Sequence, residues 1–242
     1  MNIVQYMTAK WIYGHYYPLK VLEKIGIKEN EHLIIIGCGF GDTVMLAHRN
    51  FGCKLTAADI YHEAVEKTRL ELSSKKAVKI DTFYINEWQP HFVEHADHAL
   101  IEGVLSFCRE PIKLMEQLKN YVERYIAVID IVKATEKKEK KLLEIFGPNF
   151  IPRTEKEIEK ILHLTGLQVL HRGETKPDLL KKFIDDMKAA PFKTILGLLK
   201  TLSITAVRKE YRKHMARFLS LYKPPHSIKI SYFIARKRAP TP

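Results

Sequence analysis

The stretch from His32 to Glu71 constrains the fold of this chain more than any other part of its sequence. It begins with an apolar, β-branched run at 33–36, between a charged segment and a glycine, as a buried parallel strand does. Three glycines follow at alternate positions, namely Gly37, Gly39 and Gly41. Residues 43–51 then predict a helix, and 54–58 predict a second strand that ends in Asp59. The order strand, glycine turn, helix and strand predicts a parallel α/β unit.

This arrangement predicts a particular kind of ligand site. Glycine lets the backbone turn sharply and approach a ligand, because it has no Cβ. The helix that follows directs its unpaired N–H groups and the positive end of its dipole at the same place. Asp59, eighteen residues after Gly41, is placed to accept both hydroxyls of a ribose. We therefore expect an adenosine-type ligand at the carboxyl edge of the sheet.

The segments LIIIGCGFGD and AADI resemble the first two motifs of class I S-adenosylmethionine-dependent methyltransferases. A dinucleotide site is the competing interpretation, but G-x-G-x-x-G requires a third glycine where this chain has Asp42. A strand, turn and helix without any ligand is the other alternative. The family usually has an acid two residues before the first glycine, which helps to order the glycine loop. Here that position is Ile35.

The resemblance implies S-adenosylmethionine as cofactor, S-adenosylhomocysteine as product, and a set of cofactor-binding residues. These are Tyr17, Gly37, Cys38, Gly39, Gly41, Asp59, Ile60, Asn86, Glu87, Trp88 and Glu102. Cys38 is expected to contact the ligand through its backbone. Asn86 or Glu87 matches the position that contacts the adenine amino group, and Trp88 either stacks on adenine or is an ordinary loop aromatic. No metal ligands are expected.

Two residues are candidates for a catalytic role. Glu102 lies at the predicted end of the fourth strand, where the reacting methyl group is expected; alternatively its backbone contacts the cofactor and its side chain faces solvent. His15, in the aromatic N-terminal stretch, is either a base or a structural group. The segment GVLSFCREPIKLMEQL resembles the family's segment after that strand, but Ser106 and Phe107 replace two histidines, which excludes a histidine base there.

The fold implied is a doubly wound, seven-stranded, mostly parallel, Rossmann-like sheet whose last strand is antiparallel. The further strands are expected at 77–85, 96–105, 125–132, 167–170 and 227–236, and helices at 18–25, 62–72 and 111–121. Another helix begins at a capping box, Thr154 to Glu157. We expect four parts: an aromatic flap at 1–30, the cofactor-binding core at 31–173, a basic helical lid at 174–226, and the last strand with a basic tail at 227–242.

Charge is distributed unevenly along the chain. The formal net charge is +12, and residues 172–242 contain 17 Lys and Arg against 5 Asp and Glu, so they carry all of the excess. A basic lid suits an acidic substrate, or peripheral contact with an anionic membrane surface. It also suits phosphates of nucleic acid, but no Asn–Pro–Pro–Tyr-type motif follows the fourth strand, and we expect no specific nucleic-acid partner.

The sequence therefore predicts an S-adenosylmethionine-dependent methyltransferase for a small-molecule or lipid-like, acidic substrate. The alternatives are an RNA or other nucleic-acid methyltransferase, and a protein that binds the cofactor without catalysis. Three scattered cysteines without metal-ligand spacing, no apolar run of about 20 residues and no visible signal peptide predict a cytoplasmic protein. The substrate atom that is methylated and the oligomeric state are not encoded in any motif.

Overall fold

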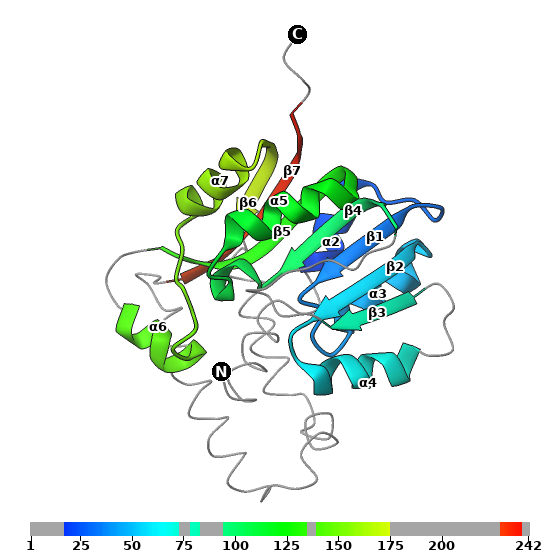
Figure 1. Cartoon of the computed structure of the whole chain (residues 1–242), viewed down its shortest axis with the longest axis horizontal. Helices are drawn as coiled ribbons and strands as arrows, with labels where there is room; N and C mark the ends of the chain where they lie inside the picture. The colour runs from blue at the N-terminus through cyan, green and yellow to red at the C-terminus, as the bar shows by residue number, and fades with distance from the viewer. Residues whose placement is uncertain (1–16, 73–77, 83–93, 135–138, 175–227, 239–242) are drawn as a thin grey trace, which may run out of the picture.

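Seven strands form one sheet in the order β3-β2-β1-β4-β5-β7-β6 in the computed structural model (Figure 1). The structure describes residues 17–72, 78–82, 94–134, 139–174 and 228–238. The strands are β1 (His32–Ile36), β2 (Lys54–Asp59), β3 (Val78–Thr82), β4 (Ala96–Glu102), β5 (Val122–Lys133), β6 (Leu167–Glu174) and β7 (Ile228–Lys237). The helices are α2 (Tyr17–Ile25), α3 (Asp42–Phe51), α4 (His62–Leu72), α5 (Pro111–Tyr121), α6 (Glu139–Phe146), α7 (Glu155–Leu164) and the short 3-10 helix η2 (Leu105–Phe107).

The strand directions place a ligand crevice in the middle of the sheet. β1 pairs in parallel with both β2 and β4, and β4 pairs in parallel with β5. β7 is antiparallel to both of its neighbours, β5 and β6. After β1, the chain forms β2 and β3 on one side of β1, and then returns to form β4 on its other side. The carboxyl ends of β1 and β4 therefore border the switch point at which open α/β sheets bind ligands.

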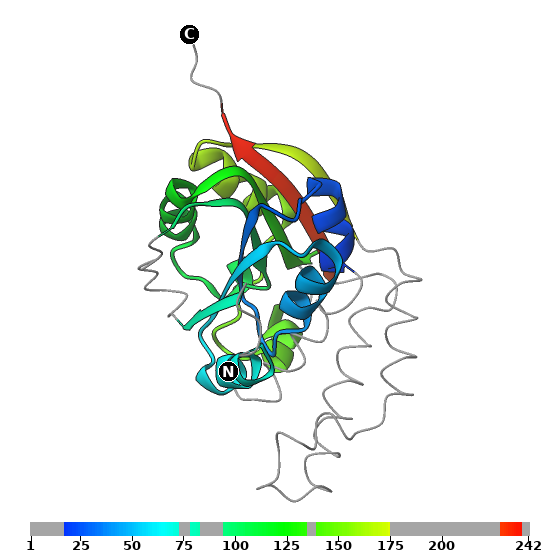
Figure 2. The ribbon, with the colours of Figure 1, turned by 90° about the vertical axis from the view of Figure 1, so that its right-hand side faces the viewer.

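The core lies on both faces of the sheet. Leu33 and Ile35 of β1 pack in one cluster with residues of α2 and α3, whereas Ile34 and Ile36 pack in the other with residues of α5 and α7. Because side chains of a strand alternate, only a strand covered on both faces has every residue buried. Figure 2 shows α2 and α3 on one side of the sheet and α5 on the other. The predicted α/β class with a mostly parallel sheet is confirmed.

Element boundaries agree where local signals are strong. The helix at 111–121 begins with a proline, and the capping box of α7 is present, with Thr154 and Glu157 bonding reciprocally. The fourth strand was expected to reach residue 105 but ends at Glu102, because Gly103 turns the chain with a φ of 65°. The sixth strand continues beyond 170 to Glu174, because β7 offers backbone partners as far as Ser231. The predicted lid, 174–226, lies outside the described residues except for Glu174, which ends β6. No described helix is long and apolar enough to cross a bilayer.

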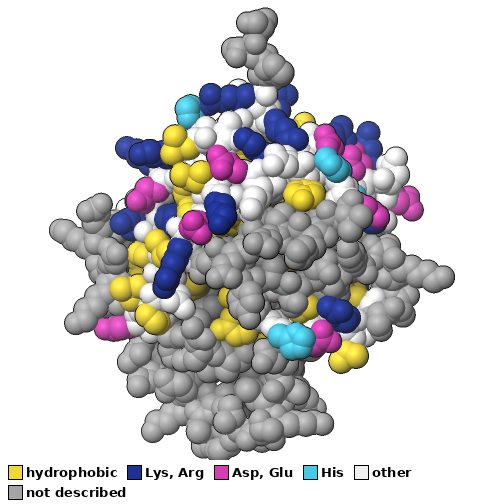
Figure 3. Space-filling model, in the orientation of Figure 1, with side chains coloured by type: hydrophobic (Ala, Val, Ile, Leu, Met, Phe, Trp, Pro, Cys, Tyr) yellow, Lys and Arg dark blue, Asp and Glu magenta, His cyan; other side chains and the backbone are white. Residues whose placement is uncertain are grey.

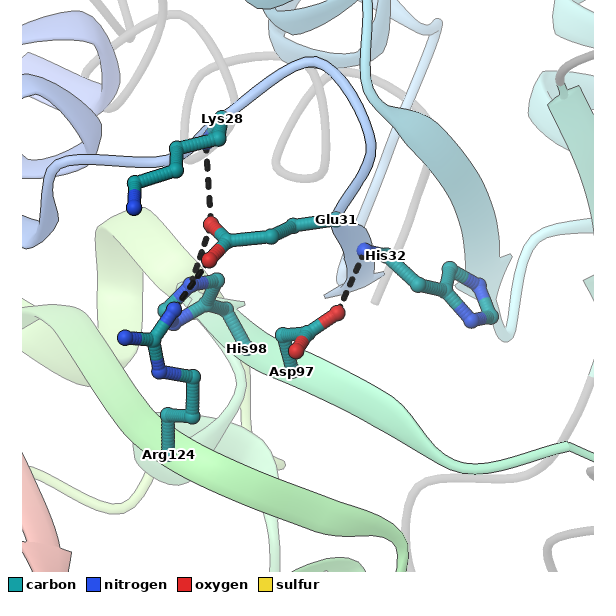
Figure 4. Close-up of polar contacts among 6 residues, drawn as sticks. All are labelled: Lys28, Glu31, His32, Asp97, His98 and Arg124. Carbon is teal, nitrogen blue, oxygen red and sulfur yellow. Dashed lines mark hydrogen bonds and ion pairs between the residues drawn. The ribbon is translucent and has the colours of Figure 1, made fainter.

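A polar cluster lies at the opposite, amino edge of the central strands (Figure 4). Glu31 accepts from the backbone N–H of Lys28 at 2.9 Å, lies 3.0 Å from His98 Nε2, and pairs with Arg124. The Asp97 carboxylate accepts the backbone N–H of His32 at 2.9 Å. His98 is 1% exposed and stacks parallel to the ring of Tyr125. This cluster ties β1, β4 and β5 together at the end of the sheet away from the crevice.

Candidate functional site

The glycine loop after β1 tolerates only glycine at its key positions. Gly37, Gly39 and Gly41 have φ values of 84°, 57° and 87°, in the left-handed region that side chains disfavour. A Cβ on Gly37 would lie 2.3 Å from the carbonyl oxygen of Glu102, and one on Gly41 would lie 2.5 Å from Cγ2 of Thr68. The loop therefore runs in close contact with the end of β4 on one side and with α4 on the other.

Asp59 holds this loop in place. Its carboxylate is 2% exposed and accepts the backbone N–H of Gly39 at 2.7 Å on Oδ2 and that of Tyr61 at 3.1 Å on Oδ1. The sequence suggested a ribose-binding role for Asp59 and left the ordering of the loop unexplained, because Ile35 replaces the usual acid. Ile35 is fully buried in the apolar core. Asp59 thus supplies from β2 an anchor for the glycine loop that β1 lacks.

Further contacts tie the loop to β2 and α4. The backbone N–H groups of Gly37 and Cys38 donate to Ala58 O at 2.8 and 3.1 Å. The Thr68 hydroxyl donates to Gly39 O at 3.3 Å, a contact that sequence reasoning missed, since 62–72 was predicted only to be a helix. Cys38 is 3% exposed and belongs to the apolar core cluster that contains Leu33 and Ile35.

The amino end of α3 contributes donors to the same place. Gly41 is its N-cap residue and makes no side-chain capping bond. The first N–H groups of a helix have no partner within it, and together with the helix dipole they favour an anionic group. α3 therefore provides a favourable position for a carboxylate or phosphate next to the glycine loop.

Glu102 ends β4 beside this loop. Its side chain is 3% exposed, which contradicts the alternative that it faces solvent. The chain turns away immediately afterwards, and the Gly103 N–H donates to Ile129 O of β5 at 2.8 Å. Val104 follows and lies against Gly37, since a Cβ on that glycine would be 2.8 Å from Val104 Cγ2. The end of β4 and the residues after it therefore form one wall of the crevice.

A buried ionic network fixes that wall. Asp130, toward the carboxyl end of β5 and fully buried, accepts the backbone N–H of Ser106 at 3.1 Å and also the Ser106 hydroxyl. The guanidinium of Arg153, 9% exposed, donates to Leu105 O and, at 2.8 Å, to Cys108 O. Burial lowers the pKa of Arg153, and the Asp130 carboxylate opposes that effect. Sequence reasoning singled out neither charge; the one signal was an acid inside the apolar run YIAVIDIV.

This network limits the chemistry of the segment after β4. The Ser106 hydroxyl is buried and bonded to Asp130, so it is not presented to a substrate. Burial raises the pKa of the Cys108 thiol to about 11, which keeps it protonated at neutral pH. All three cysteines are buried, and none forms a disulfide. The segment therefore offers neither a histidine nor a thiolate as base.

The predicted site residues divide into two groups. The structure brings the glycine loop, Asp59 and Glu102 together at the carboxyl edge of β1, β2 and β4. Ile60 follows β2 and packs, partly buried, against the core, and Tyr17 is the first residue of α2. His15, Asn86, Glu87 and Trp88 lie outside the described residues. The described part of the chain contains no group of three or more potential metal ligands.

Solved structures with the same fold exist, although neither a protein-family model nor a curated protein sequence matches this chain. Phosphoethanolamine N-methyltransferase 2 of Haemonchus contortus, in complex with phosphomonomethylethanolamine and S-adenosylhomocysteine, aligns with a TM-score of 0.75 at 15% identity. The match covers 97% of this chain and 57% of that one, so the present chain spans little more than half of that protein's length.

Two further structures resemble it over most of both chains. A cyclopropane synthase from Mycobacterium tuberculosis has a TM-score of 0.70 at 13% identity, with 90% of this chain and 83% of that chain covered. A [4+2]-cyclase has a TM-score of 0.69 at 14% identity, with 92% and 80% covered. At these identities the likeness is one of fold, and the predicted resemblance to the methyltransferases is confirmed at that level. One fold carries several reactions, so the activity must be argued from the site.

Proposed function

We propose that this chain is an S-adenosylmethionine-dependent methyltransferase that acts on a small-molecule or lipid-like substrate. The observation that carries the proposal is the glycine loop, bonded to Asp59 and packed against the end of β4, at the switch point of a sheet with the methyltransferase fold. A Cβ at Gly37 or Gly41 would collide with Glu102 or Thr68, so these contacts fix the path of the loop, and its backbone is the part that we propose contacts the ligand.

Each part of the cradle suits a different part of the cofactor. Asp59 is the proposed ribose ligand, and the N-terminus of α3 with the glycine loop suits the carboxylate of the methionine moiety. Asn86, Glu87 and Trp88 are proposed to contact the adenine, and Tyr17 the methionine end. When bound, the cofactor supplies an activated methyl group on a sulfonium. The protein has to orient the acceptor and exclude water.

Glu102 is the proposed acid–base group of the site. Its buried carboxylate lies at the end of β4, on the wall that the Asp130–Arg153 network holds rigid. A carboxylate there is suited to orient a protonated acceptor or to hold the proton that the acceptor loses. His15 is a second candidate base.

An anionic small molecule is the proposed substrate class. Two of the structural neighbours are named with phosphorylated ligands, phosphomonomethylethanolamine and geranyl diphosphate. In this chain the basic excess belongs to residues 172–242. A lid at 174–226 is proposed on topological grounds: β6 ends and β7 begins at the carboxyl edge of the sheet, where Lys229 and Glu174 form an ion pair. The segment between them is therefore attached to the sheet on the ligand side.

Calorimetry with S-adenosylhomocysteine tests the cofactor assignment. We expect micromolar binding, and Asp59→Ala should weaken it more than tenfold, because charge-assisted hydrogen bonds of about 1.5–3 kcal/mol each are lost. NAD should not compete, and tight NAD binding would contradict the methyltransferase assignment. Labelled S-adenosylmethionine incubated with metabolite and lipid extracts should then identify the acceptor.

One structural neighbour, the [4+2]-cyclase, keeps a second function open for the same site. It is named for a cyclisation, and a cofactor-binding protein without methyl transfer is the corresponding alternative for this chain. Tight S-adenosylhomocysteine binding with no label transferred to any extract fraction would favour that alternative.

A further inference from the structure

The sheet ends in β6, whose outer edge borders a groove against α7. Within the described residues β6 pairs only with β7. The groove has a volume of about 660 Å³ and is lined by residues 167–172 of β6 together with one face of α7. Successive side chains of a strand point to opposite faces, so a groove lined by consecutive residues follows the edge of the strand and reaches its backbone. An edge strand offers a row of N–H and C=O groups for pairing with another chain.

The rim of this groove is basic. Lys156 and Lys160 of α7, Arg172 of β6 and Arg238 line it, against one carboxylate, Glu159. That carboxylate already pairs with Arg172, Oε1 to Nη1 at 2.9 Å, and so links the helix to the strand across the groove. Figure 3 shows Lys and Arg side chains gathered over α7, at the upper left. Two half-buried apolar residues, Val169 and Leu170, also line it, and Val169 packs against the core on the face that α7 covers.

We infer that this α7–β6 groove binds an extended, acidic peptide segment of a partner protein, which adds to the sheet beside β6. In such strand addition, main-chain hydrogen bonds provide affinity and the flanking side chains provide specificity. Apolar residues of the peptide would meet Val169 on the α7 side of β6, and its carboxylates would meet Lys156, Lys160 and Arg238. The inference is independent of the proposed methyl transfer, since the groove lies on the sheet edge and contains no residue of the crevice.

The lining of the groove disfavours other anionic partners. Single-stranded nucleic acids bind through aromatic platforms on which bases stack, and no Phe, Tyr or Trp lines the groove in the described part of the chain. A membrane surface is bound by apolar side chains that project outward, whereas Val169 and Leu170, the apolar residues in the middle of the lining, are half-buried. An extended peptide fits both the groove and the exposed strand edge.

Basic residues and an irregular register also protect edge strands from unwanted pairing, and β6 has such an irregularity between Val169 and His171. This protection is selective, however. Lysines that repel a neutral or basic strand attract an acidic one, so charge complementarity decides which segment pairs. Protection alone predicts no binding of any peptide, whereas docking predicts binding of acidic peptides only.

Fluorescence anisotropy on the full-length protein tests the inference, with a labelled decapeptide of alternating glutamate and valine as probe. We expect saturable binding, and a lysine–valine decapeptide should not bind. The double variant Lys156→Glu/Lys160→Glu should weaken binding at least tenfold. The matched control, Lys20→Glu/Lys24→Glu, makes the same change of charge at exposed positions of α2 and should leave binding within twofold. S-Adenosylhomocysteine affinity should be unchanged in both variants.

A second peptide separates strand pairing from simple charge attraction. Methylation of alternate backbone amides keeps every carboxylate but removes the N–H groups needed for pairing, and it should weaken binding at least tenfold. Equal affinity of the two peptides, equal loss in the two double variants, or no binding of the parent peptide would each overturn the inference. Binding of poly-uridine or of phosphatidylserine vesicles that requires Lys156 and Lys160 would replace the peptide with nucleic acid or membrane and also overturn it.

Discussion

At Gly37 two structural requirements coincide, and a second glycine allows them to be separated. Gly37 has a φ of 84° and no room for a Cβ, whereas Gly26 has a φ of 72° and nothing within 4 Å of its Cβ position. Gly26→Ala should cost only the backbone strain, about 1 kcal/mol, while Gly37→Ala should cost about 3 kcal/mol or more, because backbone must also move. Urea unfolding of both variants measures the difference. Equal losses would show that the contact between the glycine loop and β4 is not tight.

Single titrating side chains should also make the fold sensitive to acid. Burial lowers the pKa of His98, although Glu31 opposes the effect, and burial likewise lowers the pKa of His32. The unfolded chain, with histidine pKa values near 6.5, then binds protons more readily than the folded chain. Stability should therefore fall as the pH drops below about 6.5.

Glu31 adds a second dependence on pH. Burial raises its pKa, but the interactions with Lys28, His98 and Arg124 outweigh this effect, so the net pKa is lowered. The contribution of Glu31 to the free energy of unfolding is fully present above pH 4.5 and is lost as the pH falls through the lowered pKa of the folded state.

The histidine contribution can be measured by thermal unfolding between pH 7.5 and 5. His98→Gln keeps a hydrogen-bond donor for Glu31 and removes the titration, so the fall in melting temperature should be reduced by about half, with His32 supplying the remainder. His163→Gln, at an exposed position of α7, is the control. A wild-type melting temperature that rises on acidification from pH 7 to 5 would contradict the assignment.

At the scale of elements, the segment from β4 to α5 depends on two buried charged residues, Arg153 and Asp130. Arg153 donates to two carbonyl oxygens of this segment and compensates the charge of Asp130. Arg153→Met should lower the free energy of unfolding by about 3–5 kcal/mol, because it removes two charge-assisted hydrogen bonds to carbonyl oxygens and the favourable charge interaction with the buried Asp130 carboxylate. Arg172→Met, which removes an exposed pair with Glu159, should cost about 0–1 kcal/mol. Similar losses in the two variants would mean that Asp130 is stabilised by other groups.

At the scale of the whole molecule, the proposed lid can be separated from the sheet. β6 and β7 pair as far as Glu174 and Ser231, so a short turn can join them without altering the sheet. Deletion of residues 176–224 should leave S-adenosylhomocysteine affinity within about tenfold and abolish methyl transfer, because acceptor binding is lost while the glycine loop is retained. Transfer at the full rate would show that these residues do not bind the substrate. Pelleting of the full chain with anionic but not neutral vesicles would indicate a membrane role.

Local signals in the sequence were sufficient for most of the framework. The run 33–36, the alternating glycines, the proline at 111 and the capping box at 154–157 each act through contacts within a few residues, so their effects follow from spacing alone. The close grouping of the glycine loop and Asp59 at one sheet edge followed as well, because parallel strands joined by a helix end at the same edge.

Contacts between distant residues were decided only by the tertiary structure. The bond from Gly39 to Asp59 spans 20 residues, the contact of Thr68 with the loop spans 29, and Arg153 reaches Leu105 across 48. A sequence states which side chains are able to pair, but the packing of helices on the sheet selects which of them meet. The same reason explains why β6 runs to Glu174 and why basic residues of α7 border its edge: both depend on the neighbour that the fold places beside the strand, and no local pattern encodes that neighbour.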